Sequence, residues 1–120
     1  MSRSVPERDW RFLRKIEPEM LGVLYARINK QARDLLESPG ESERDRYHRL
    51  YRHVKDSDRI VGDCFDDWRR SNILFKIPLL RREGLLTDEH LSQMSDEVKD
   101  FLERLARLEN ESGRIAGRGA

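Results

Sequence analysis

Apolar residues recur at steps of three and four over the first third of the chain, and this spacing constrains the fold more than any other feature. The series consists of Trp10, Leu13, Ile16, Met20, Leu24, Ile28 and Leu35. Pro18 lies inside it, where a proline removes a backbone donor and clashes with the preceding turn. Because the apolar face keeps its phase across Pro18, we expect one long amphipathic helix with a kink or tight junction there.

A second series with the same period follows the helix breaker Ser38-Pro39-Gly40. It consists of Tyr47, Leu50, Tyr51, Val54, Val61, Cys64, Phe65, Trp68 and Phe75. These positions fall on one side of a helix, so we expect them to be its buried face, with Ser42 as the N-terminal cap. Each of the two helices would contain about thirty residues, and a break at Asp56-Ser57-Asp58 remains an open alternative.

The last third of the chain contains signals of shorter helices. Pro78 ends or bends the second helix, and Gly84 is placed to stop a short helical stretch after it. Thr87 and Ser95 are each placed to cap a further helix, the second of which we expect to end near Leu108. The segment 110–120 has no apolar period, so we expect a disordered tail.

These expectations describe one all-α domain. With 120 residues the chain has room for one hydrophobic core. We expect residues 1–109 to form a long antiparallel helical hairpin covered by shorter C-terminal helices, which makes a three- to four-helix bundle. Residues 110–120 would be the tail.

The charge balance and the cysteine content limit the cellular compartments and the classes of partner that we expect. The 24 basic and 23 acidic residues nearly cancel, so no global field attracts the chain to nucleic acid or to a membrane. The chain has one cysteine, and we expect a reducing compartment. Its first residues lack the apolar centre of a signal peptide, and no apolar run reaches the length of a membrane span. These features predict a cytoplasmic protein with no membrane partner.

The side chains that commonly carry chemistry do not converge in the sequence. Asp63, Asp66 and Asp67 lie within about one turn and could clamp a divalent cation, but neighbouring arginines favour a solvated face with ion pairs. His48 and His53 lack the spacing of a zinc-binding helix, and Cys64 falls within the apolar series. There is no Gly-rich phosphate loop. We therefore expect no catalytic residue, no metal and no cofactor.

One segment is strongly basic and is the candidate for binding an anion or a partner. Its bases are Arg69, Arg70, Lys76, Arg81 and Arg82, with no acid between the first and the last. Arginine forks suit phosphate, but the neighbouring aromatics belong to the apolar series and leave no stacking platform. The acidic stretch from Thr87 to Glu109 offers these bases partners within the fold or across a dimer, and we favour this pairing over nucleic acid.

Several apolar residues lie off the main stripes and need a further layer to cover them. These candidate interface residues are Phe12, Val23, Leu36, Ile73 and Leu74. A second copy of the chain would be an economical cover for residues that the C-terminal helices leave open.

Our leading interpretation is a non-catalytic helical interaction or regulatory module that acts through protein–protein contacts. Its expected partner is itself, as a homodimer, or another protein. The first alternative is a nucleic-acid-associated protein that uses the segment from Arg69 to Arg82. A third is a small all-α enzyme that acts on an anionic substrate, which would need a closed pocket lined by several arginines.

Overall fold

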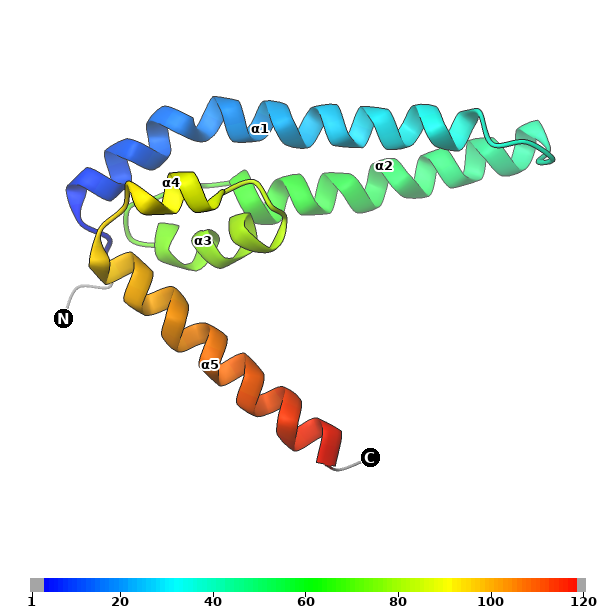
Figure 1. Cartoon of the computed structure of the whole chain (residues 1–120). Helices are drawn as coiled ribbons and strands as arrows, with labels where there is room; N and C mark the ends of the chain where they lie inside the picture. Colours follow the sequence, from blue (N-terminus) through cyan, green and yellow to red (C-terminus); the bar gives the residue numbers. More distant parts are fainter. Residues whose placement is uncertain (1–3, 119–120) are drawn as a thin grey trace.

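The computed structural model describes residues 4–118, with side chains as far as residue 113, and these residues form five α-helices (Figure 1). The helices are α1 (Glu7–Leu36), α2 (Glu43–Phe65), α3 (Ile73–Arg82), α4 (Asp88–Ser92) and α5 (Asp96–Arg118). No strand occurs in this part of the chain, which confirms the all-α fold class.

Helix α1 is continuous through Pro18. Its buried apolar residues follow the predicted stripe from Leu13 to Leu24, because steps of three and four keep them on one side. Figure 1 shows that the axis of α1 changes direction within its N-terminal half. The region of Pro18 is a suitable place for this bend, since the missing proline N–H weakens the hydrogen-bond ladder of the helix.

Helix α2 runs in the opposite direction beside α1 and differs from the sequence-based prediction at its end (Figure 1). The side chain of Ser42 caps it, accepting a hydrogen bond from the Asp45 N–H, and the helix passes through Ser57 without a break. It ends at Phe65, although the apolar series predicted a helix reaching Phe75. The backbone of Asp67 is left-handed, with a φ of 57°, which no α-helix accommodates.

The residues between α2 and α3 form an ordered junction. The indole N–H of Trp68 donates to the Cys64 carbonyl at 2.7 Å, and the ring stacks on Phe65. The Asn72 side chain bonds to the backbone of Asp67 and Arg69. The junction therefore keeps Trp68 against the core, although this residue lies outside α2.

The two C-terminal caps are where the sequence predicted them. Thr87 and His90 form a reciprocal capping box on α4, and Ser95 precedes α5 with its Oγ accepting from the Val98 N–H. The end of α5 differs from the prediction. The helix continues past Leu108 and ends at Arg118, so its C-terminal end lies ten residues beyond the predicted one. Residues 119–120 lie outside the described part.

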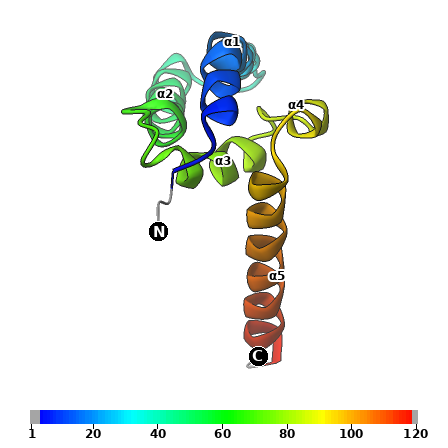
Figure 2. The same ribbon diagram turned by 90° about the vertical axis from the view of Figure 1, so that its left-hand side faces the viewer.

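The core lies at one end of the α1–α2 pair. In α1 the fully buried apolar residues end at Leu24, and in α2 they are confined to Cys64 and Phe65. Residues from α3, from the loop after it and from the start of α5 complete this core. Figure 2 shows α3 and α4 on one side of the α1–α2 pair, and α5 extends from there away from this pair.

The molecule is therefore extended and has two arms. Its radius of gyration is 17.9 Å, whereas a compact chain of this length has about 14 Å. One arm is the half of the α1–α2 pair that lies beyond the core, and the other is α5 (Figures 1 and 2). The two arms are therefore the parts of the fold that the other helices cover least.

Candidate interaction surfaces

A buried carboxylate fixes the start of the α5 arm. Asp9 has 0% exposure, and its two oxygens accept hydrogen bonds from the backbone N–H of Ser95 at 2.9 Å and from the Ser95 hydroxyl at 2.5 Å. Ser95 directly precedes α5, where helix N–H groups lack internal partners and the helix dipole favours negative charge. Sequence reasoning missed this role, because the two residues are 86 positions apart.

The first three bases of the predicted binding segment all have acceptors within the chain. Arg69 pairs with Asp67 at 2.8 Å. Arg70 donates to the Val5 carbonyl at 3.3 Å, and Lys76 donates to the Asp63 carbonyl at 2.7 Å. Arg69 therefore pairs within the α2–α3 junction, whereas Arg70 connects the junction to the segment before α1 and Lys76 connects α3 to α2.

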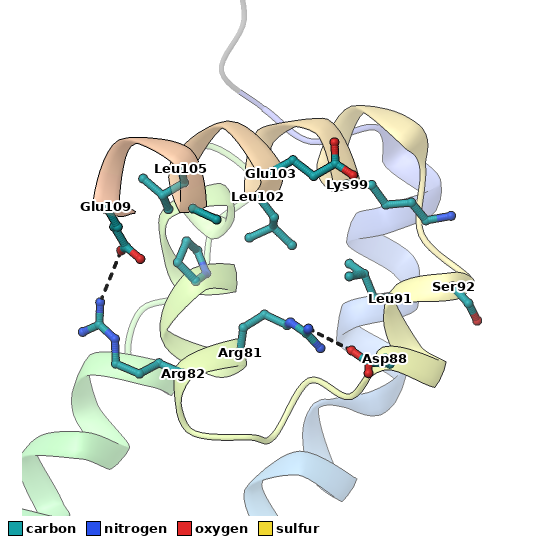
Figure 3. Close-up of a pocket in the computed structure, with 12 residues that line it drawn as sticks. Arg81, Arg82, Asp88, Leu91, Ser92, Lys99, Leu102, Glu103, Leu105 and Glu109 are labelled. Atoms are coloured by element: carbon teal, nitrogen blue, oxygen red, sulfur yellow. Dashed lines mark hydrogen bonds and ion pairs between the residues drawn. The ribbon is translucent and has the colours of Figure 1, made fainter. Parts of the chain in front are cut away.

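The other two bases line a groove of about 700 Å³ between α3, α4 and α5 (Figure 3). Arg81 pairs with Asp88 at 2.8 Å and also donates to the Leu86 carbonyl. Arg82 lies 3.9 Å from Glu109 of α5. Both carboxylates belong to the acidic stretch from Thr87 to Glu109, which the sequence analysis predicted to pair with these bases. Each arginine faces a carboxylate, and Lys99 and Glu103 of α5 also line the groove, so the groove carries charges of both signs.

Apolar side chains from α4 and α5 form the walls of this groove. Leu91, Leu102 and Leu105 are half-buried and lie around it (Figure 3). Beyond the groove, Leu108 of α5 is 60% exposed. The α5 arm thus carries an apolar stripe that the rest of the chain covers only near its start.

The candidate residues for chemistry remain separate. Within the described residues no group of three or more potential ligands could hold a metal ion. Asp67 faces Arg69, whereas His53 bonds to the Ile28 carbonyl across the α1–α2 pair at 3.0 Å. Burial raises the pKa of the Cys64 thiol, and the carboxylates of Glu83 and Asp63 raise it further, against a smaller opposite effect of Lys76. A raised pKa disfavours the nucleophilic thiolate.

The five predicted interface residues have very different surroundings. Ile73 is fully buried and presents no surface to a partner. Phe12 and Leu74 are half-buried against the core, and the Phe12 ring makes an edge contact with His90. Val23 and Leu36 are about half exposed. The structure therefore keeps two of the five as open surface.

A larger apolar surface lies on the α1–α2 arm, and its three members from α2 are residues that the sequence predicted to be buried. Its five members, which we call the arm face, are between 45% and 63% exposed: Tyr25, Leu36, Tyr47, Tyr51 and Val54. The prediction that Val54 is a core residue is wrong. The apolar series of α2 alone does not show which of its residues other helices cover. Helices α3 and α4 lie beside only the half of the α1–α2 pair near the core (Figure 1).

Helix geometry places all five members on one side of the α1–α2 pair. Each member comes directly after a residue that is more covered than itself. Tyr25 comes after the buried Leu24, and Val54 comes after His53, whose ring bonds to the Ile28 carbonyl of α1. One residue is a step of about 100° around a right-handed helix. In two antiparallel helices this step leads to the same side of the pair. Arg27, which donates to the carbonyl of Glu83 at the end of α3, lies on the opposite side, so the arm face lies on the side of the pair away from the end of α3.

Comparisons with known proteins give no relative. No protein-family model matches the chain, and neither does any curated protein or solved structure. In the part of the chain that the structure describes, no helix is long and apolar enough to cross a membrane.

Proposed function

We propose that this chain is a non-catalytic helical interaction module that acts through protein–protein contacts as a homodimer. The observation that carries the proposal is the arm face. Three aromatic or β-branched side chains of α2 and two large apolar side chains of α1 share one exposed side of a thin arm. Several large apolar side chains exposed on one side of a molecule are typical of interaction sites. The single, buried cysteine fits a reducing compartment, and we place the module in the cytoplasm.

The extended shape supports the same proposal. A chain of this length gains stability by burying apolar surface, yet here two arms project from a small core. A second copy that covers an arm would supply the missing burial without any new element. The buried aromatic side chains would be the main anchors of such an interface, since tyrosine contributes a large contact area at low entropic cost.

The alternatives have weaker support. Nucleic-acid binding needs bases that are free to contact phosphate, and all five bases from Arg69 to Arg82 have acceptors within the chain. An enzyme that acts on an anion needs unpaired cationic groups in a closed pocket, whereas the groove near α5 is open and its arginines face carboxylates.

Light scattering during gel filtration, from low to high micromolar concentration, tests the proposal. We expect the mass to rise from 14.3 kDa toward twice that value. A mass that stays at 14.3 kDa throughout would contradict the homodimer. The same samples should be titrated into a labelled DNA duplex, where salt-dependent binding at low micromolar protein would instead favour the nucleic-acid alternative.

A further inference from the structure

We propose that the arm face packs against the arm face of a second copy, antiparallel, with a two-fold axis that passes beside Tyr51. This inference rests on the proposed homodimer and names its surface and register. The occupant is a second copy because the apolar spacing of the arm face is nearly symmetric about Tyr51 and because one pair of charges beside it, Arg44 and Asp58, complements itself.

The spacing of α2 sets the position of the axis. Tyr47 and Val54 lie four residues before and three residues after Tyr51. An antiparallel two-fold axis beside Tyr51 therefore places Tyr47 of each copy opposite Val54 of the other. The two Tyr51 side chains lie beside the axis, each with the Lys55 ammonium 5.3 Å from the centre of its ring. Each of the three arm-face residues of α2 then has an apolar neighbour on the second copy.

The spacing of α1 gives the same axis independently. His53 bonds to the Ile28 carbonyl, which makes these positions level, so Tyr51 is level with Lys30. The midpoint between Tyr25 and Leu36 falls directly after Lys30, within about 1.5 Å along the helix. The axis that pairs Tyr47 with Val54 thus also pairs Tyr25 of one copy with Leu36 of the other.

The charges beside the arm face fit the same register. Arg44 and Asp58 lie seven residues before and after Tyr51, which is about two helical turns, so all three lie nearly in line on α2. Among the described residues neither Arg44 nor Asp58 has an ion-pair partner. The two-fold axis places Arg44 of each copy opposite Asp58 of the other, and so forms two ion pairs at the rim.

The size of the surface sets the expected strength. From Arg44 to Asp58 helix α2 is about 21 Å long, and two helices side by side are about 20 Å wide. A surface of about 400 Å² per copy in projection, or about 800 Å² for both copies, is below the roughly 1,000 Å² of a stable specific interface, so we expect a weak, transient dimer that dissociates in the micromolar range.

Cysteine cross-linking tests the register. Tyr51→Cys should give a disulfide-linked dimer on mild oxidation at high micromolar protein, because the axis brings the two copies of this position together. The matched control is Val23→Cys, since Val23 is 49% exposed against 57% for Tyr51 and does not belong to the arm face. A second test mixes Tyr25→Cys with Leu36→Cys, where we expect the mixed disulfide to exceed both homodimeric products.

Each outcome decides between the two proposals. Rapid cross-linking of Tyr51→Cys with slow cross-linking of Val23→Cys, together with the excess of mixed disulfide, supports the register. If the wild-type chain is dimeric by mass but Tyr51→Cys cross-links no faster than Val23→Cys, this inference is wrong and the homodimer uses another surface. If the wild-type chain is monomeric at high micromolar concentration, both proposals fail.

Discussion

Asp9 is the residue on which the position of α5 depends most directly. It belongs to the first turn of α1, and its carboxylate receives both the backbone N–H and the hydroxyl of Ser95. A buried carboxylate without such donors would be strongly destabilising, and buried donors without the carboxylate would also be costly. The interaction therefore fixes the angle at which α5 leaves the core.

Replacing this carboxylate should weaken the fold. In Asp9→Ala two part-buried donors of Ser95 lose their acceptor, and we expect a loss of about 1–3 kcal/mol in the free energy of unfolding. Glu7→Ala is the matched control, because Glu7 lies in the same turn but is exposed and pairs only with Arg11. Urea denaturation followed by circular dichroism measures both variants. Equal effects of the two substitutions would show that Asp9 has no special role.

Cys64 should be unreactive while the chain is folded. It is buried, and its pKa is raised by burial and by Glu83 and Asp63. An aromatic disulfide reagent at mildly basic pH should therefore modify native protein on the order of a hundredfold more slowly than protein in urea. The raised pKa means that the unfolded chain loses the thiol proton first, so the contribution of Cys64 to stability is lost as pH rises above the ordinary thiol pKa. Equal modification rates in the two states would contradict the burial of Cys64.

At the scale of elements, local sequence signals predicted the helices well, but they did not predict which other elements pack against each helix. The caps at Ser42, Thr87 and Ser95 were predictable because a cap depends on residues three positions away. The end of α2 at Phe65 was not, since the apolar period continues through a junction held by Trp68 and Asn72. The same period could not separate Phe65, which is buried, from Val54, which is exposed, because cover depends on α3 and α4.

A pair of substitutions in α2 tests this division of the helix. Phe65→Asp should unfold the domain, because it places a charge in the core with no partner. Val54→Asp should keep a cooperative thermal transition and the helical circular dichroism spectrum, since Val54 is already half exposed. A cooperative Phe65→Asp variant would contradict the core described above, and an unfolded Val54→Asp variant would contradict the open arm face.

We expect the end of α5 to contribute little to the stability of the domain. Residues 110–113 are exposed, and among the described side chains the exposed Glu109 of α5 lies 3.9 Å from Arg82 of α3. Deletion of residues 110–120 should therefore leave the melting temperature nearly unchanged, as measured by calorimetry. A fall of about ten degrees would show that this segment packs against the domain, since such a shift corresponds to more than about 1 kcal/mol in a chain of this size.

At the scale of the whole molecule, the account concerns how an extended chain covers its apolar surface. The all-α class follows from the sequence, but the arm face appears only when the three-dimensional cover of each helix is known. The candidate residues Val23 and Leu36 are open, and Ile73 is buried, because α3 turns back under the α1–α2 pair (Figure 2). The sequence predicted unsatisfied apolar surface, and the structure locates most of it on the α1–α2 arm.

Sedimentation equilibrium of charge-reversal variants tests the central claim most directly. Arg44→Asp or Asp58→Arg alone replaces two attractive pairs at the proposed interface by two repulsive ones, so each should raise the dimer dissociation constant roughly tenfold. The double variant restores both pairs with reversed signs, and its dissociation constant should return to within about threefold of the wild-type value. Single variants that dimerise as tightly as the wild-type chain, or a double variant as weak as the singles combined, would contradict the antiparallel homodimer through the arm face.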